Sequence, residues 1–179
     1  MTYDLATGLV TRPPDQHLRD RVALLADLGL GEPDDEFDAF ADRLAEDAGE
    51  SYAMVNLVTD HQHFVGLHNP AGGESTLVGR TMSLDEGYCP EVVARGHALP
   101  LPDVCASPRY AANRVFDLLH VRTYTGAPLL HTPSGLVIGA LCVAGPEPQP
   151  FEKAQERLDL VKDRCREFME LVRRRRAHA

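Results

Sequence analysis

Several features that mark other classes of protein are missing from this sequence. Tryptophan is absent and aromatic residues make up only 6% of the chain, which leaves little material for the stacking platforms that bind single-stranded nucleic acids. The formal net charge of −9 also argues against a nucleic-acid-binding surface. No apolar run reaches the roughly 18 residues of a membrane span, and the first residues lack the basic and apolar parts of a signal peptide. We therefore expect a cytoplasmic protein with neither a nucleic-acid nor a membrane partner.

The cysteines and histidines show no metal-ligand spacing. Four cysteines, Cys89, Cys105, Cys142 and Cys165, lie far apart without a Cys-x-x-Cys pair. In a reducing compartment they are expected to be free thiols. The eight histidines form neither a helical His-x-x-x-His pair nor the Cys/His spacing of a zinc site. The sequence predicts no metal site.

The length of 179 residues and the apolar content of 44% suit one globular domain. Residues 1–14 are polar and end in two prolines, so we expect a flexible leader over 1–14 and a single domain over 15–179. Apolar periodicity and turn residues predict the following elements. Helices are expected at 16–28, at 34–49 with Asp34 as cap and Gly49 at the end, at 90–95, from 107 with Ser107 as cap, and at 151–175. Strands are expected at 51–59, 61–68, 97–104 (at an edge, because of its prolines), 123–130 and 136–143, with a loop over 69–82.

Residues 122–145 are the most informative stretch. They read as two strands joined by a turn at 133–135, and Gly139 inside the second strand leaves room for a close backbone approach or a bulge. The stretch resembles the end of a GAF domain, a small-molecule sensing module, at Tyr124, Gly126, Pro128, Leu129, Gly135, Gly139, Leu141, Cys142 and Val143. Residues 83–93 and Asp103 with 107–110 resemble earlier segments of the same family, so the resemblance covers about residues 35–172. It implies an α+β fold with a central antiparallel sheet of five to six strands and helices on its faces.

The resemblance also implies a ligand site between the sheet and the loop–helix segments. Carried over position by position, the candidate site residues are Phe64, Tyr88, Cys89, Asp103, Tyr110, Asn113, Tyr124 and Thr125. Together they would form an apolar cup with a few polar groups, as small-molecule sites do. The tyrosines and the negative net charge favour a neutral or aromatic ligand, whereas an anion would suit the helix start at Pro90. No cofactor is predicted, but the resemblance leaves haem or another chromophore open, with His120 and His131 flanking the hairpin.

Three functions remain in view. The leading interpretation is a small-molecule-binding sensory or regulatory GAF domain that acts through a separate signalling protein. The second is a GAF-fold enzyme with thiol redox chemistry at Cys89, because some GAF proteins reduce free methionine sulfoxide with cysteines in this region. Cys89 could equally be a small buried residue that fills space. The third interpretation is a scaffold without a ligand that serves only in protein interaction.

The last predicted helix carries a heptad-like apolar stripe. The stripe consists of Ala154, Leu158, Val161, Cys165, Phe168 and Val172, at the alternating four- and three-residue spacing of a coiled-coil seam. This helix either packs on its own sheet or also meets its copy in a homodimer, beside the stripe Leu18, Val22 and Leu25. Because GAF domains commonly associate through terminal helices, the resemblance favours a homodimer.

Overall fold

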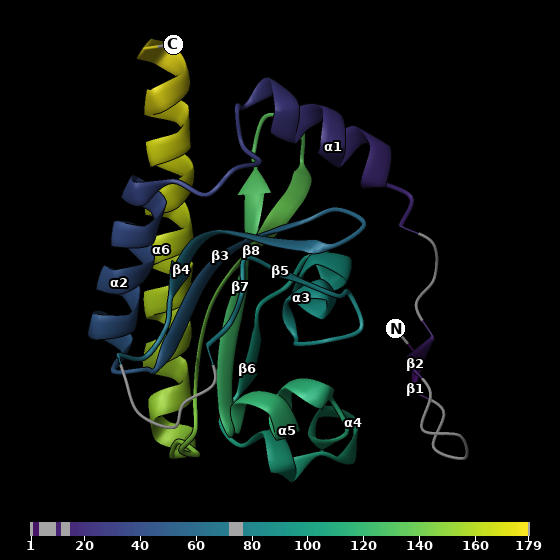
Figure 1. Ribbon diagram of the computed structural model, residues 1–179, viewed down its shortest axis with the longest axis vertical. Coiled ribbons are helices and arrows are strands. Elements are labelled where there is room, and N and C mark those ends of the chain that lie inside the picture. The colour runs from purple at the N-terminus through teal and green to yellow at the C-terminus, as the bar shows by residue number, and fades with distance from the viewer. Residues whose placement is uncertain (1, 4–9, 12–14, 72–76, 179) are drawn as a thin grey trace.

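The computed structural model describes residues 2–3, 10–11, 15–71 and 77–178 (Figure 1). Its helices are α1 (Leu18–Asp27), α2 (Asp35–Ala48), α3 (Cys89–Arg95), α4 (Pro108–Ala111), α5 (Arg114–Leu119) and α6 (Phe151–His178), with a 3-10 turn η1 at Val104–Ala106. Its strands are β1 (Thr2–Tyr3), β2 (Val10–Thr11), β3 (Tyr52–Val58), β4 (Gln62–His68), β5 (Thr81–Met82), β6 (Leu99–Leu101), β7 (Thr123–His131) and β8 (Leu136–Gly145). The expected leader over 1–14 lies mostly outside the described residues.

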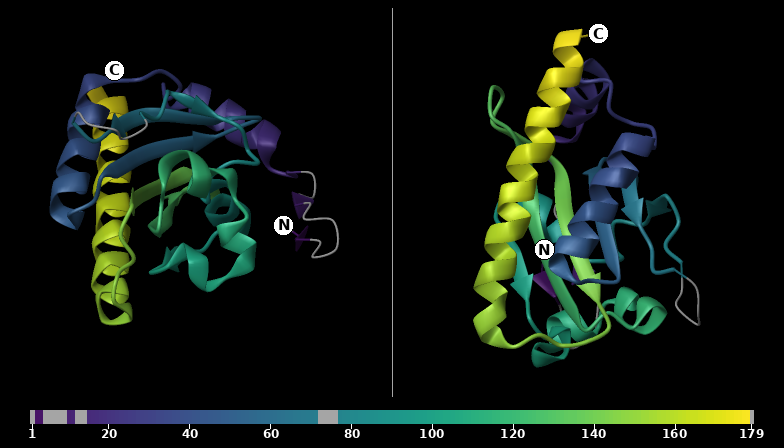
Figure 2. Two further views of the ribbon diagram at one scale, coloured as in Figure 1. Left: turned by 60° about the horizontal axis from the view of Figure 1, so that its bottom comes forward. Right: turned by 90° about the vertical axis from the view of Figure 1, so that its left-hand side faces the viewer.

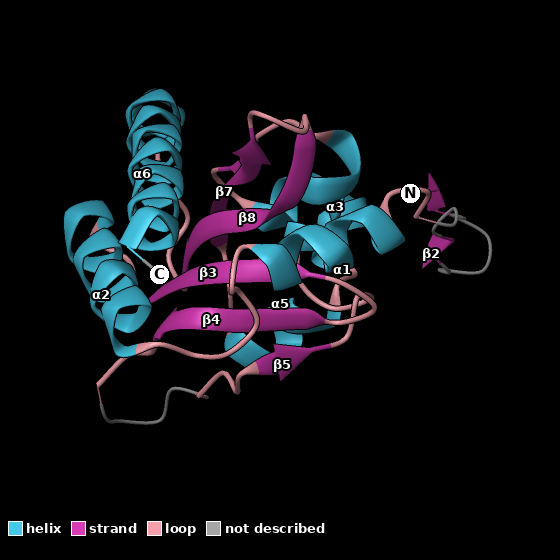
Figure 3. Ribbon diagram, turned by 90° about the horizontal axis from the view of Figure 1, so that it is seen from above, coloured by secondary structure: helices cyan, strands magenta, loops and turns pink. Residues whose placement is uncertain are grey.

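Six strands form one antiparallel sheet in the order β5-β4-β3-β8-β7-β6, while β1 pairs only with β2. Helices α2 and α6 cover one face of this sheet, and α3 and α5 lie on the other (Figures 1 and 3). The predicted fold class, an α+β domain with helices on the faces of an antiparallel sheet, is confirmed. The proline-containing strand β6 lies at the edge, as its composition predicts.

The sheet separates two apolar cores because side chains alternate between its faces. Along β3, Val55 and Leu57 join the core with α2 and α6, whereas Tyr52 and Met54 join the core with α3 and α5. All seven residues of β3 are buried, since both faces are covered. The second core holds the candidate site.

The helix α6 packs along the sheet beside α2 (Figure 2). Its stripe residues Val161, Cys165, Phe168 and Val172 are buried in the first core. The Phe168 ring meets Phe37 at 5.0 Å and Phe40 at 5.4 Å between ring centroids, both edge to face. The stripe therefore packs within the protomer, and these four residues cannot form the seam of a dimer. The homodimer itself stays a prediction.

Glycine is required where β3 and β8 pair most closely. Gly139 lies opposite Leu57, and a Cβ atom there would come within 2.1 Å of the Asn56 carbonyl oxygen. That distance is far inside van der Waals contact, so only glycine lets the two backbones approach. The close approach predicted at Gly139 is confirmed.

Helix α2 has the predicted ends. The Asp34 carboxylate accepts a hydrogen bond from the Glu36 N–H, and Gly49 ends the helix at φ 64°. Helix α4 begins at Pro108 after Ser107 in the cap position, as predicted, although the Ser107 side chain makes no capping hydrogen bond. Two features differ from the expectations. The segment 69–82, whose residues 72–76 lie outside the described part, ends in strand β5 rather than in loop. Helix α5, capped by Asn113, was not predicted.

Within the described residues, no helix combines the length and the apolar character needed to cross a membrane.

Candidate functional site

A small cavity lies between the sheet and the segments that carry α3 and α5. Its volume is about 30 Å³, enough for about two water-sized groups. Tyr52, Met54 and Ala144 line it from the sheet, and Val115 lines it from α5. Pockets for drug-sized ligands span about 300–1,000 Å³, so this conformation is shaped for something much smaller.

Two cysteines and a tyrosine form one end of the cavity. Cys89 is the first residue of α3 and Cys142 lies in the middle of β8, and their sulfur atoms are 3.3 Å apart. The Tyr124 hydroxyl donates a hydrogen bond to the Cys89 sulfur at 3.2 Å. The Met54 sulfur lies 3.6 Å from the Cys142 sulfur on the other side. Three sulfur atoms and one phenol therefore meet in the second core.

The surroundings shift the pKa values of the two thiols in opposite directions. The hydrogen bond with Cys142 is the largest influence on Cys89 and lowers its pKa, and the Tyr124 hydroxyl adds to that effect against the opposing effect of burial. The same contact with Cys89, together with burial, raises the pKa of Cys142. Burial also raises the pKa of Tyr124, which keeps the phenol protonated as a donor. Cys89 is thus the thiol of the pair that ionises first.

Gly126 makes room for the phenol of Tyr124. A Cβ atom on Gly126 would lie 2.1 Å from the Tyr124 hydroxyl oxygen, because the ring folds back over this residue two positions along β7. The ring also packs edge to face on Tyr88, with centroids 5.1 Å apart. Gly126 therefore sets the direction in which the Tyr124 hydroxyl reaches Cys89.

Two buried amides hold the loop that leads to Tyr88. The Gln62 side-chain NH₂ group donates to the carbonyl oxygens of Ser83 at 2.6 Å and Glu86 at 2.7 Å. Its own oxygen accepts from the Asn56 side-chain NH₂ group at 2.8 Å. The Asn56 amide oxygen is buried and has no hydrogen-bond partner among the described residues. Sequence reasoning missed both amides, although a polar residue inside an apolar strand was the available signal.

Four of the predicted site residues line the cavity: Phe64, Tyr88, Cys89 and Tyr124. The other four do not. The Asp103 carboxylate caps η1 through the Cys105 N–H at 2.9 Å and pairs with Arg122 at 3.1 Å. Thr125 and Ala127 are two residues apart in β7, so their side chains point to the same face of the sheet. Ala127 packs in the core with α6, so Thr125 faces away from the cavity.

Tyr110 and Asn113 have structural partners next to the cavity. The Tyr110 hydroxyl donates to the Glu91 carboxylate at 3.3 Å, and burial, followed by the charge of Glu91, raises the pKa of Tyr110. The Asn113 side-chain oxygen accepts from the Gly87 N–H at 2.9 Å and from the Val115 N–H at 3.1 Å. Its NH₂ group donates to the Gly87 carbonyl oxygen at 2.9 Å. Asn113 thus ties α5 to the loop before α3.

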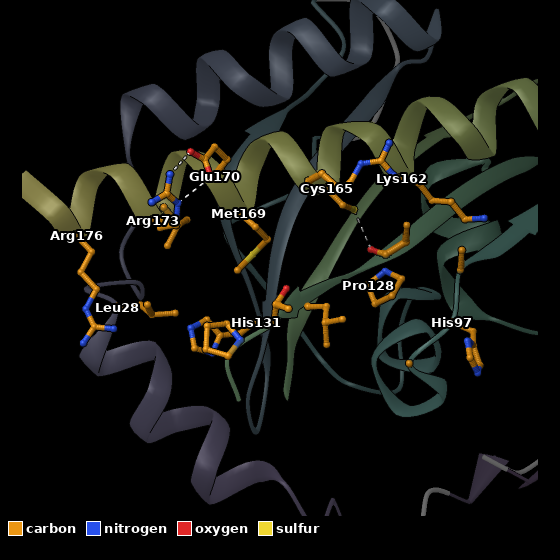
Figure 4. Close-up of a pocket in the computed structure, with 18 of the residues that line it drawn as sticks. Leu28, His97, Pro128, His131, Lys162, Cys165, Met169, Glu170, Arg173 and Arg176 are labelled. Carbon is orange, nitrogen blue, oxygen red and sulfur yellow. Dashed lines mark hydrogen bonds and ion pairs between the residues drawn. The ribbon is translucent and has the colours of Figure 1, made fainter. Parts of the chain in front are cut away.

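A second hollow lies on the surface of the domain, along α6 (Figure 4). It is a groove of about 1040 Å³ between α6 and the residues around the β7–β8 turn. Met169 of α6 faces the turn that carries His131. Lys162, Arg166, Arg173 and Arg176 place positive charge along it, and Glu170 is the one carboxylate among the described residues that line it.

The cavity does not suit haem. Its volume of about 30 Å³ is far below that of a porphyrin, and none of the described residues that line it is a histidine. His120 follows the last residue of α5 and has a φ of 52°. The His131 ring forms a hydrogen bond with the Ser134 hydroxyl at 2.7 Å. Neither histidine lines the cavity.

Comparison with known proteins identifies the family to which the fold belongs. The family model of the GAF domain matches residues 32–169. One similar solved structure is a type II free methionine-R-sulfoxide reductase from Thermoplasma acidophilum, with 15% identity, a TM-score of 0.59 and coverage of 77% of this chain and 90% of that one. Another is the GAF domain of an Acinetobacter phosphoenolpyruvate-protein phosphotransferase, with 15% identity, a TM-score of 0.58 and coverage of 92% and 98%.

A third similar structure is a free methionine-R-sulfoxide reductase from Neisseria meningitidis, with 20% identity, a TM-score of 0.54 and coverage of 93% of this chain and 97% of that one. At these identities the likeness concerns the fold alone. Among curated proteins, no sequence matches significantly.

Proposed function

This chain belongs to the GAF domain family, and we propose that it is a sensory or regulatory domain that binds a small neutral molecule in the cavity beside Tyr124. The observation that carries the proposal is the cavity itself. It lies between the sheet and the α3 and α5 segments, and it combines apolar walls with the Tyr124 hydroxyl and the Gln62 amide. An apolar hollow with a few polar groups is the usual make-up of a small-molecule site.

The lining argues for a neutral ligand. None of the described residues that line the cavity is an aspartate, glutamate, lysine, arginine or histidine. Burying an anion or a cation there would cost several kcal/mol without a partner. A volume of about 30 Å³ suits a molecule of a few heavy atoms. A larger ligand would have to displace the loop before α3, which the Gln62 and Asn113 hydrogen bonds hold in place.

A thermal-shift screen with small neutral molecules tests the proposal. A ligand present at 100 times its Kd stabilises the folded state by about 2.7 kcal/mol, which a melting curve resolves. Val115→Ile adds one methylene to the cavity wall and should remove the shift while the protein stays folded. Leu77→Phe, an enlargement of a side chain that is 66% exposed and lines neither the cavity nor the proposed dimer faces, is the control and should keep the shift. A shift that survives Val115→Ile would place the ligand elsewhere.

A scaffold without a ligand is the second candidate, and the small cavity favours it. If no compound stabilises the wild-type protein, the domain works through its surface alone. The groove along α6 offers the surface for this role, because Leu130 is 45% exposed at its edge and Leu158 and Met169 line it.

We also propose that the protein forms a homodimer through the outer faces of α1 and α6 and passes its signal to a separate protein. The exposed Val22 on α1 and the half-buried Leu158 on α6 support this arrangement. Leu158→Glu would place a charge in such an interface and should convert a dimer to a monomer in sedimentation velocity. A wild-type protein that sediments as a monomer at high concentration would exclude the dimer.

A further inference from the structure

The two thiols at the end of the cavity have no role in the ligand binding proposed above. Cys89 and Cys142 are 53 residues apart in the chain, yet the fold brings their sulfur atoms to 3.3 Å. They are 4% and 1% exposed. We propose that Cys89 and Cys142 form a redox-active dithiol, which hydrogen peroxide or a hydroperoxide of similar size oxidises to an intramolecular disulfide.

The geometry allows this bond with little movement. A disulfide has a sulfur–sulfur distance of about 2.05 Å, so the two atoms must approach by just over 1 Å. The other two cysteines have no such partner. Cys105 is exposed, and Cys165 lies on the other side of the sheet, where its sulfur contacts the Ala127 carbonyl oxygen at 3.5 Å. The pairing of Cys89 with Cys142 is therefore specific among the four cysteines of the chain.

The surroundings assign a role to each thiol. The Tyr124 hydroxyl donates to the Cys89 sulfur at 3.2 Å, and a donor at this position stabilises a thiolate. The contact with Cys142 lowers the pKa of Cys89 and raises that of Cys142. Cys89 is therefore the attacking thiolate, and Cys142 is the thiol that resolves the intermediate.

The cavity supplies access for the oxidant. Both cysteines line it, and its volume of about 30 Å³ holds about two water-sized groups. Hydrogen peroxide has two oxygen atoms and fits this space. A bulky oxidant such as a glutathione disulfide is far larger than this volume and does not fit.

The chemistry balances in two steps. The Cys89 thiolate attacks one peroxide oxygen, and the O–O bond breaks. The other oxygen departs as hydroxide, and Cys89 becomes a sulfenic acid. The Cys142 sulfur then attacks the Cys89 sulfur, the S–O bond breaks, and the second hydroxide leaves. The protons of the two thiols convert both hydroxides to water. Overall, two thiols lose two electrons to the peroxide, and one disulfide and two water molecules form.

Peroxide treatment of the full chain, followed by thiol blocking in denaturant and peptide mapping, tests the proposal. In the wild type we expect one peptide pair that joins Cys89 to Cys142 and is released by dithiothreitol. Cys105→Ser is the matched control and should give the same pair. In Cys142→Ser, Cys89 should instead accumulate as a sulfenic acid, which dimedone traps when it is added together with the denaturant. If Cys142→Ser does not fold, Cys142→Ala takes its place in the same assay.

A second measurement tests the role of the phenol. In the Cys142→Ser background, Tyr124→Phe removes the hydroxyl that donates to Cys89. The loss of one hydrogen bond of about 1 kcal/mol should slow the formation of the sulfenic acid, trapped by dimedone after a denaturing quench, about fivefold. An unchanged or faster rate would contradict the assigned role of Tyr124.

Two outcomes in the wild type would overturn the dithiol proposal. One is that Cys89 and Cys142 both stay thiols while the exposed Cys105 is oxidised. The other is that Cys89 advances to sulfinic acid while Cys142 stays a thiol. Ligand binding is measured in reducing buffer by the thermal-shift screen, so failure of the dithiol and failure of the sensory function give separate results.

Discussion

The substitution Gly126→Ala tests how the site is built. The new Cβ atom would lie 2.1 Å from the Tyr124 hydroxyl oxygen and 2.7 Å from its Cζ atom. Ordinary contact needs about 3.4 Å or more, so the phenol must move by roughly 1 Å. This movement breaks the 3.2 Å hydrogen bond to the Cys89 sulfur and presses the ring against Tyr88.

The expected change in the free energy of unfolding combines two destabilising effects and one stabilising effect. Overpacking a core costs about 1–3 kcal/mol, and the lost hydrogen bond costs about 1 kcal/mol. Replacing glycine by alanine in an ordered element returns about 0.5–1 kcal/mol of chain entropy. We therefore expect Gly126→Ala to lower the free energy of unfolding by about 1–3.5 kcal/mol, seen as a lower urea midpoint with an unchanged slope.

A double-mutant cycle tests whether the clash with Tyr124 is the cause. In a Tyr124→Leu background the hydroxyl and ring are gone, so Gly126→Ala should cost about 1–2 kcal/mol less than in the wild type. Gly31→Ala is the control, because a Cβ atom there has nothing within 4 Å and no positive φ; it should change stability by less than about 0.5 kcal/mol. An equal cost of Gly126→Ala in both backgrounds would refute this reasoning.

Three further predictions concern the surroundings of the site. Phe168→Glu should unfold the protein, because it buries a charge in the first core, whereas Leu158→Glu should leave the circular dichroism spectrum unchanged. Asn113→Ala should lower the free energy of unfolding by about 2–3 kcal/mol in urea titrations, because it removes a helix cap and two hydrogen bonds. The hydrogen bond from Arg80 holds the pKa of Asp38 below its ordinary 3.8. The stability from this carboxylate is therefore complete above pH 3.8 and is lost as the pH falls through the lower folded-state pKa. Asp38→Asn should remove that part of the acid dependence of the melting temperature, and an unchanged profile would contradict the assignment.

Local patterns account for much of the fold. The hairpin 123–145 could be predicted because a continuous apolar run and the turn at 133–135 leave few alternatives. The ends of α2 followed from Asp34 and Gly49, whose conformations are set by their immediate neighbours. Helix α5 was not predicted because its six residues are too few to show a helical period.

The site was only half predictable because contacts between distant segments decide it. Of the residues taken from the family pattern, Tyr88, Cys89 and Tyr124 line the cavity. Asp103 does not line it, because its carboxylate pairs with Arg122, which comes from a segment 19 residues further along. The pairing of Cys142 with Cys89 was missed for the same reason, since nothing within either segment indicates the other.

The methionine methyl groups offer the most direct test of where a ligand binds. The sequence has four methionines; Met54 and Met82 line the cavity, and Met169 lines the groove along α6. With methyl-labelled methionine, we predict that a ligand from the neutral-molecule screen shifts the Met54 and Met82 resonances and leaves Met169 unchanged. A shift confined to Met169 would contradict ligand sensing in the cavity and place binding in the groove.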